Sequence, residues 1–454
     1  MWFRVVLMLL ACVDLATLPV NSARILAVQT VCGKSHWNFM SGVLRALVEG
    51  GHTVTAFTPF PDGNQENYTE VDISRDMYCF REQNLKGAVA NFSRPVSVID
   101  LMVLLSREQC DTVYANDRMI ELMRQNAATP FDLVFIEPLM SECVSYIATL
   151  LDVPVIYVIP LSVTSLMEHY NTGHFSNPAV VSHVLAAYGL PTTFVQRLTN
   201  TAIFAYELVT SKFTMSLVKR NNPRPYDLVP LYKPSLVFVN SHPVMSASSS
   251  IVTNVINVGG IHLNVAKSLP KDILEFIEQS PIGVIYFSFG STTKMSSLPE
   301  HIKKAFLEVL AELPQRILMK YEEELEDKPK NIMTKKWLPQ RDILLHPNVK
   351  LFISHGGISG LYETIDAGVP ILGFPLFGDQ PRNIDTLVNN GMAISMDLFS
   401  VTKESFLKNV LDLLNNEKYT KNAKSSSEIF KDRSMSPEQS VVYWTEYVIR
   451  HKGA

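Results

Sequence analysis

Residues 337–383 read WLPQRDILLHPNVKLFISHGGISGLYETIDAGVPILGFPLFGDQPRN, and this stretch decides the fold. Val349–Ser354 is a short apolar run, and a histidine followed by two glycines leads directly into a helix predicted over residues 358–367. Residues 369–374 form a second apolar run, and a glycine-containing turn precedes another predicted helix. Strands that alternate with helices in this way indicate two consecutive βα steps of a parallel sheet.

The loops that follow these two strands carry a pattern suited to an anionic ligand. Ligands of open α/β sheets collect at the carboxyl ends of the strands. Glycines let a ligand approach the backbone, and the free N–H groups at a helix start bind anionic oxygens. His355 and Ser359 add side-chain donors, and Glu363 follows Ser359 by one helical turn, so it can reach sugar hydroxyls. A diphosphate with a sugar on each side suits this pattern.

The same stretch closely resembles the signature of the UDP-glycosyltransferases, and it matches from Trp337 to Gln380 without a gap. The resemblance implies that Trp337 stacks on uracil and that Gln340 holds the nucleoside ribose. Ser359 stands where vertebrate members commonly have Asn. The remaining donor contacts that the resemblance implies are His355, Gly357, Ser359 and Gly360 at the diphosphate, Glu363 at the ribose hydroxyls, and Asp379 and Gln380 at the donor sugar. The alternative is an ordinary βα turn with a core tryptophan and a hydrogen-bonded histidine.

The first part of the chain contains a further βαβ pattern. A strand is predicted over residues 25–31, a helix over residues 39–49 and a strand over residues 52–57. The loop after the first strand holds His36, and the ordinary pKa of histidine suits a general base near neutral pH. This loop is similar to the S-H-W/Y element of the family, so the resemblance implies that His36 removes the proton of the acceptor.

A histidine base needs an anion on its other ring nitrogen. Residues 131–136 are predicted as a buried strand that ends at Glu137, where the family pattern usually has Asp. We expect Glu137 to orient His36. Glu142 is the local competitor for this role, and Glu137 could instead only cap the helix that follows it.

Residues 160–234 lose the βα rhythm and contain many aromatic and histidine residues. We expect a loop-rich wall there that surrounds a hydrophobic acceptor. Residues 236–240 are predicted as the last strand of the first domain. Val284–Ser288 is predicted as a strand of the second domain, and the following Gly290-Ser291 resembles the F-G-S element of the family, whose serine meets a phosphate oxygen.

The resemblance implies an α/β protein of the GT-B fold, with two Rossmann-like parallel-sheet domains that face a cleft. The predicted boundaries are residues 24–240 for the acceptor domain, 241–267 for a linker and 268–435 for the UDP-sugar domain. Residues 436–454 are predicted as a final helix with Ser436 as its cap. The resemblance implies that this helix crosses back to the first domain.

Composition and targeting signals indicate a secreted-type protein. The 454 residues are 47% hydrophobic and 19% charged with a net charge of −4, so nothing suggests nucleic acid as a partner. Residues 1–23 are typical of a secretory signal peptide. Asn67 and Asn91 begin glycosylation sequons. Four cysteines remain after signal removal, and their three possible pairings stay open: Cys32, Cys79, Cys110 and Cys143.

We expect this protein in the secretory pathway, in the lumen of the endoplasmic reticulum or secreted. Animal members of the family usually continue into a membrane helix and a short basic tail. We find no run of about 18 uncharged apolar residues in the sequence. Membrane association is therefore expected only through a C-terminal anchor that this chain lacks, and a homo-oligomer is possible.

The function implied is an inverting, metal-independent transfer of a sugar from a UDP-sugar to a hydroxyl of a small lipophilic acceptor, which forms a β-glycoside. Acceptors of this kind are phenols, flavonoids, steroids and xenobiotics. Several of the matched segments resemble those of insect members of the family, and this resemblance favours glucose as the transferred sugar. The alternative is a homologue that binds UDP-sugar without turnover. A Rossmann dehydrogenase is disfavoured because no G-x-G-x-x-G follows the first strand.

Overall fold

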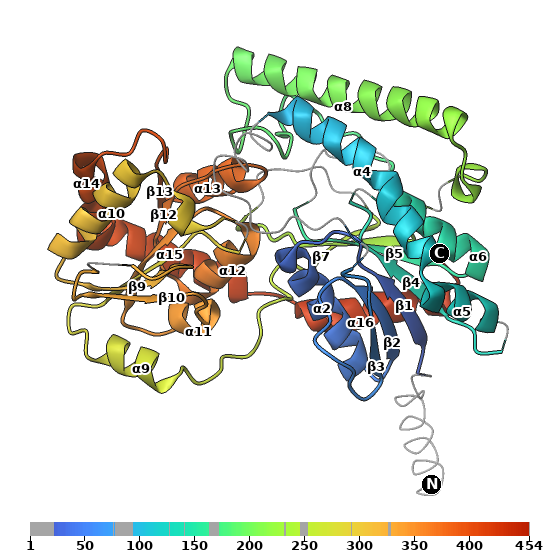
Figure 1. Cartoon of the computed structure of the whole chain (residues 1–454), viewed down its shortest axis with the longest axis horizontal. Coiled ribbons are helices and arrows are strands. Elements are labelled where there is room, and N and C mark those ends of the chain that lie inside the picture. Colours follow the sequence, from blue (N-terminus) through green and yellow to red (C-terminus); the bar gives the residue numbers. More distant parts are fainter. Residues whose placement is uncertain are drawn as a thin grey trace, which may run out of the picture.

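The computed structural model describes residues 22–75, 77, 94–126, 128–139, 141–162, 172–230, 233–245, 253–291, 293–325 and 328–453. These residues form two α/β halves, each built around one parallel sheet (Figure 1). Most of the predicted signal peptide, the sequon at Asn91 and Cys79 lie outside the described residues.

The first sheet has seven parallel strands in the order β3-β2-β1-β4-β5-β6-β7. Successive residues of β1 point to opposite faces, and both faces are buried. One face packs on α2 (Lys34–Glu49) and α16 (Pro437–Arg450), and the other packs on α4 (Pro95–Ala115), α5 (Asp117–Gln125) and α6 (Tyr146–Leu151). The strands are β1 (Arg24–Val28), β2 (Thr53–Thr58), β3 (Tyr68–Asp72), β4 (Leu133–Ile136), β5 (Val155–Ile159), β6 (Leu236–Val239) and β7 (Val255–Asn257).

The second sheet has six parallel strands in the order β10-β9-β8-β11-β12-β13. Its central strands are also apolar and buried on both faces, which is typical of parallel sheets. The predicted bounds of β8 and β11 are confirmed. The strands are β8 (Val284–Ser288), β9 (Arg316–Lys320), β10 (Ile332–Lys335), β11 (Val349–Ser354), β12 (Ile371–Gly373) and β13 (Ala393–Ser395).

Helices cover both sheets. Those of the first half are α2 (Lys34–Glu49), α4 (Pro95–Ala115), α5 (Asp117–Gln125), α6 (Tyr146–Leu151) and α8 (Phe194–Asn221), with short 3-10 turns η1 (Glu142–Ser145) and η2 (Pro225–Asp227). Those that follow are α9 (Lys271–Glu278), η3 (Met295–Ser297), α10 (Glu300–Glu312), α11 (Gln340–Leu344), α12 (Ile358–Ala367), α13 (Gln380–Asn389), α14 (Lys403–Asn415), α15 (Glu417–Lys431) and α16 (Pro437–Arg450).

The last helix, α16, belongs to the core of the first half, as predicted (Figure 1). Ser436 and Gln439 form a capping box at its start. Val441 and Val448 are fully buried in the same cluster as Trp37 of α2. The end of the chain is therefore fixed to the first domain, and the two-domain GT-B arrangement predicted from the sequence is confirmed.

Two local predictions are wrong. Helix α2 begins at Lys34, so His36 lies in its first turn and not in a loop. The predicted linker contributes β7, a three-residue edge strand too short to give a periodic signal. Residues 68–72 form the other edge strand, β3. The exposed Asn67 precedes it in a left-handed conformation.

The largest error concerns α8, a 28-residue helix within the segment predicted to be loop-rich. Its apolar residues surround the whole helix, so the sequence has no single apolar stripe at helical spacing. A signal for its start was present. Thr193 and Gln196 form a capping box at its first turn.

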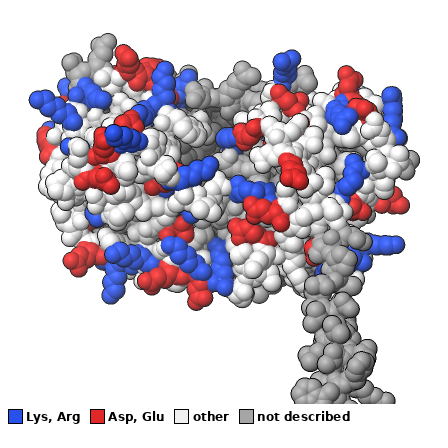
Figure 2. Space-filling view, turned by 90° about the horizontal axis from the view of Figure 1, so that it is seen from below, with Lys and Arg blue, Asp and Glu red and all other residues white. Residues whose placement is uncertain are grey.

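Cys110 and Cys143 form a disulfide that joins α4 to η1, and Cys32 is also disulfide-bonded. Among the described residues, no helix has the length and apolar content needed to cross a membrane. Figure 2 shows acidic and basic side chains interspersed over one face of the molecule, and this face has no extended basic region.

Candidate active site

A cavity of about 420 Å³ lies between the two halves, at the carboxyl ends of both sheets. Loops after β1, β8, β10, β11 and β12 form its walls. His36 lines the cavity, and so do all ten residues predicted to bind the donor: Ser291, Trp337, Gln340, His355, Gly357, Ser359, Gly360, Glu363, Asp379 and Gln380. The fold thus brings residues from distant parts of the sequence to one place.

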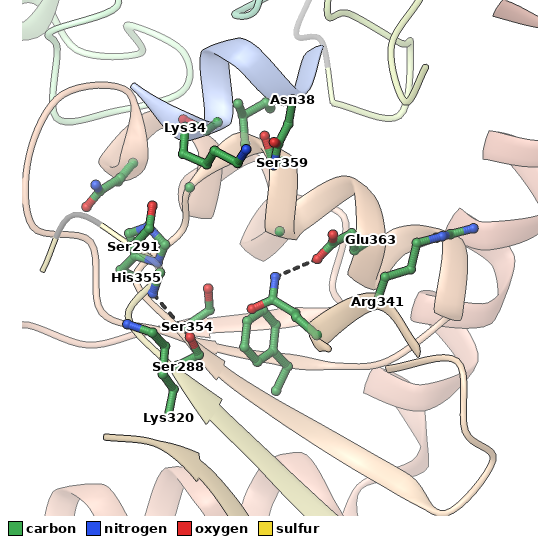
Figure 3. Close-up of a pocket in the computed structure, with 18 of the residues that line it drawn as sticks. Lys34, Asn38, Ser288, Ser291, Lys320, Arg341, Ser354, His355, Ser359 and Glu363 are labelled. Atoms are coloured by element: carbon green, nitrogen blue, oxygen red, sulfur yellow. Dashed lines mark hydrogen bonds between the residues drawn. The ribbon is translucent and has the colours of Figure 1, made fainter. Parts of the chain in front are cut away.

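Two glycines hold the ring of His355 at one end of the cavity. A Cβ atom on Gly290 would lie 2.6 Å from His355 Cε1, and one on Gly357 would lie 2.7 Å from Nε2. Gly290 also has a φ of +74°, which glycine adopts without strain. Because β8 and β11 are neighbours in the sheet, Ser291 lies beside His355 (Figure 3).

His355 is suited to donate hydrogen bonds as a neutral ring. Burial lowers the pKa of His355 to about 4, and the positive charge of Lys320 lowers it further. Its Nδ1 atom is buried and finds no hydrogen-bond partner among the described residues. A buried polar atom of this kind requires an explanation, such as an ordered water or a functional role.

Lys320 is a residue that the sequence analysis missed. It ends β9, the neighbour of β8, and it lines the cavity on the same side as His355 and Ser291 (Figure 3). Its Nζ lies 3.0 Å from Glu322 Oε1, and both side chains are almost buried. The available signal was its place directly after the short apolar run of residues 317–319, where a strand can end. Lys320 gives this end of the cavity a fixed positive charge.

At another side of the cavity, an exposed tryptophan stands next to a hydrogen-bonded chain of polar groups. Trp337 is 68% exposed, so the alternative of a core tryptophan is wrong. The Tyr286 hydroxyl donates to Gln340 Oε1 over 3.2 Å, and Gln340 Nε2 donates to Glu363 Oε2 over 2.5 Å. A Cβ on Gly360 would lie 2.9 Å from Gln340 Nε2. The glycine therefore makes room for the glutamine.

Glu363 titrates near neutrality in the unliganded site. Burial raises the pKa of Glu363 to about 7, although the hydrogen bond from Gln340 favours the ionised form. Figure 3 shows this carboxyl group across the cavity from Ser291, His355 and Lys320. A ligand hydroxyl that donates to Glu363 would stabilise its charged form.

Asp379 and Gln380 stand at the start of α13. Asn383 Nδ2 donates to Asp379 Oδ2 over 2.6 Å, and Gln380 Oε1 accepts from the backbone N–H of Leu376 over 2.9 Å. Burial raises the pKa of Asp379, while Asn383 opposes the rise. Both side chains are thus held by their own loop and helix at the cavity wall.

His36 and Glu137 meet because β1 and β4 are neighbouring parallel strands. His36 Nδ1 lies 2.5 Å from Glu137 Oε1, so the longer glutamate side chain reaches the ring. Glu137 is only 1% exposed, and its other oxygen accepts from the amide of Gln29. Gln29, which the sequence analysis missed, also donates to the backbone oxygen of Val31. Glu142 does not take this place. Burial raises its pKa to about 8, and its Oε1 has no hydrogen-bond partner in the part of the chain that the structure describes.

The surroundings of His36 raise its pKa. Burial alone would lower the pKa of this ring, but the charge and hydrogen bond of Glu137 outweigh burial. The charge of Asp379, from the second half, adds to the rise. His36 Nδ1 is occupied by Glu137, so Nε2 is the nitrogen that can exchange a proton with a ligand.

The wall contributed by the first half includes two further polar residues of α2. Lys34 and Asn38 point toward Ser359 of α12 (Figure 3). Lys34 Nζ lies 3.7 Å from Asp62 Oδ2, which is an exposed pairing. The cavity therefore presents polar groups from both domains.

Comparisons with known proteins agree with this geometry. The family model described as UDP-glucoronosyl and UDP-glucosyl transferase matches residues 23–454. UDP-glucosyltransferase 2 of Dactylopius coccus is 36% identical, over 100% of this chain and 89% of its own length. UDP-glucuronosyltransferase 2C1 of Oryctolagus cuniculus is 30% identical, over 92% of this chain and 88% of its own length.

Solved structures support the fold. The glycosyltransferase VinC, in complex with DTDP, has a TM-score of 0.62 at 16% identity, covering 94% of this chain and 100% of its own. The glycosyltransferase of kitacinnamycin has a TM-score of 0.60 at 17% identity, and the match covers 94% of this chain and 98% of its own. The sequence match over nearly the whole chain and the two-domain architecture lead to one conclusion: this chain belongs to the UDP-glycosyltransferase family.

Proposed function

We propose that this enzyme transfers a sugar, with glucose preferred, from a UDP-sugar to a hydroxyl of a small lipophilic acceptor, with inversion at the anomeric carbon. The observation that carries this proposal is the His36–Glu137 pair, because His36 lines the same cavity as the predicted donor residues. A base on one domain and a donor site on the other are what direct displacement requires.

The donor is proposed to lie across the second domain with its uracil on Trp337. An exposed indole gains free energy when a base stacks on it. The nucleoside ribose would replace part of the contact between Gln340 and Glu363, and the transferred sugar would meet Asp379 and Gln380. The diphosphate would lie beside Ser291, His355 and the N-terminus of α12, where backbone N–H groups are free.

In the proposed reaction His36 Nε2 takes the proton of the acceptor hydroxyl. The acceptor oxygen forms a bond with the anomeric carbon from the face opposite UDP, and the bond from that carbon to the diphosphate oxygen breaks. Glu137 stabilises the imidazolium that forms. Charge that develops on the leaving diphosphate would be balanced by Lys320 and by the N–H donors around His355, so we propose that no metal ion is needed.

The preference for glucose rests on relatives, three of which come from Dactylopius coccus; one of them is named a UDP-glucosyltransferase. The proposed compartment is the secretory pathway, which the disulfide between Cys110 and Cys143 supports, because such bonds persist in oxidising compartments.

The direct test is a turnover assay with UDP-glucose or UDP-glucuronate and a panel of phenols, flavonoids and steroids. We expect acceptor-dependent release of UDP, faster with UDP-glucose, unchanged by EDTA, and a β-linked product by NMR. Tight binding of UDP without release for any acceptor would instead identify a non-catalytic binding protein. Loss of activity in EDTA with recovery in Mn²⁺ would contradict only the proposal that no metal ion is needed, and would leave the transfer reaction itself supported.

Replacing Trp337 with Ala should weaken UDP binding by roughly 5- to 150-fold, since stacking on an aromatic ring contributes about 1–3 kcal/mol per base. Trp337→Phe should retain most of the affinity. Phe399→Ala, at an exposed phenylalanine that does not line the cavity, is the control. Calorimetric affinities that stay within about twofold for Trp337→Ala would exclude the stacking role.

The pH profile of kcat/KM should have an acidic limb above the ordinary histidine pKa of 6.5, because Glu137 and Asp379 raise the pKa of His36 and only the neutral ring is a base. Turnover should rise as pH increases through this limb. Glu137→Gln removes the charge that raises the pKa, so the limb should move to lower pH while the plateau falls.

Two companion variants sharpen this test. Glu142→Gln should leave the position of the limb unchanged, because Glu142 does not contact His36. Glu137→Asp should also reduce the plateau, since the shorter side chain must still span the distance that Glu137 now spans. An unimpaired Glu137→Gln enzyme with an unshifted limb would refute the proposed pair.

A further inference from the structure

Helix α8 exposes apolar side chains along its whole length. Its inner side packs on α4, where Ile203 and Tyr206 contact the cluster of Ile99 and Val184, and the Tyr206 hydroxyl donates to Asp100 over 2.9 Å. The other side faces solvent along the outer edge of the first half (Figure 1). A helix that is apolar on all sides is normally covered on all sides.

The exposed apolar residues form one continuous stripe. Starting from Val195, they recur every three or four positions, which places them on one face of a helix. The large ones are between 43% and 78% exposed. The stripe comprises Val195, Leu198, Ala202, Ala205, Val209, Phe213 and Leu217, with Phe194 beside it at the start. At 1.5 Å per residue the 28-residue helix spans about 42 Å. A patch of this length indicates an interaction surface.

The charges next to the stripe all have the same sign. Arg197, Lys212 and Arg220 are exposed on α8. The helix has a single acidic residue, Glu207, which is buried and lies 2.9 Å from His183 Nε2. The exposed face therefore combines apolar side chains with cations and presents no carboxylate of its own. A second copy of this face would bring like charges together, whereas an anionic surface would complement it.

We propose that α8 lies in the plane of an anionic lipid bilayer, with its apolar stripe in the boundary between headgroups and acyl chains. Lysine and arginine beside an interfacial helix keep their charges at the lipid phosphates while their stems cover apolar surface. This contact differs from a C-terminal anchor and comes from the first domain. It does not depend on the proposed transfer reaction.

The test is flotation of the purified protein with vesicles of phosphatidylcholine alone or with about 30% phosphatidylserine. We expect binding to the anionic vesicles that weakens with salt. The triple variant Leu198→Gln/Val209→Gln/Phe213→Gln should lower the partition coefficient at least about tenfold, because three large side chains leave the interface. The matched control is Val265→Gln/Ile282→Gln/Phe399→Gln, whose residues are similarly exposed away from α8.

The charge contribution is measured separately. Lys212→Gln/Arg220→Gln should reduce binding to the anionic vesicles by about 25-fold, roughly fivefold for each charge, and change binding to phosphatidylcholine little. Lys271→Gln/Lys304→Gln, at exposed lysines of α9 and α10, is the control. Equal thermal unfolding and equal UDP affinity would show that each variant is folded.

Absence of binding to both kinds of vesicle would overturn the proposal, and so would equal binding by the triple variant and its control. Sedimentation velocity without lipid tests whether a second copy of the protein covers α8 instead of a membrane. If the wild type is a dimer that the triple variant converts to monomer, while vesicle binding is unchanged, a second copy covers α8 and the membrane proposal is wrong.

Discussion

The position of each proposed reacting group depends on the order of the parallel strands. In both sheets the order reverses between two neighbours, β1 and β4 in the first and β8 and β11 in the second. The connections that follow the two strands of such a pair run to opposite faces of the sheet. This opens a crevice at the carboxyl ends of the two strands. His36 and Glu137 flank the first crevice, and Ser291 and His355 flank the second. Because both crevices border one cavity, the proposed base and the proposed anion site lie together although more than half of the chain separates them in sequence.

Burial changes the pKa values of the groups that line the cavity, and these changes determine which groups carry charge. At the proposed diphosphate end, His355 is neutral and Lys320 carries the charge. Burial raises the pKa values of Glu363 and Asp379, so both carboxyl groups lack part of the solvation that water would give them. Hydroxyl groups of a sugar nucleotide would supply the missing donors and favour the ionised forms. Donor binding and the release of protons by these carboxyl groups are therefore linked in our account.

Sequence predicted the parts of the molecule that depend on local chemistry. The turn after β11 combines glycines with His355, and apolar runs marked β8 and β11, so the second sheet and its cavity residues could be placed in advance. Sequence also placed Glu137 beside His36 but left Glu142 open as a competitor, because the reach of the carboxylate depends on strand spacing and on the Gln29 amide that holds it. Lys320 was missed because its role depends on β9 lying beside β8. Helix α8 was missed because apolar residues on all its sides leave no single stripe at helical spacing.

The central claim is that His36 is the base, and its most direct test compares turnover with donor binding in His36→Ala. We predict that kcat falls by roughly 10²–10⁴, the usual contribution of a general base, while UDP affinity changes by less than about twofold. The exposed His301 of α10 provides the control variant His301→Ala, which should match the wild type. A His36→Ala enzyme with the kcat of the wild type would contradict the account.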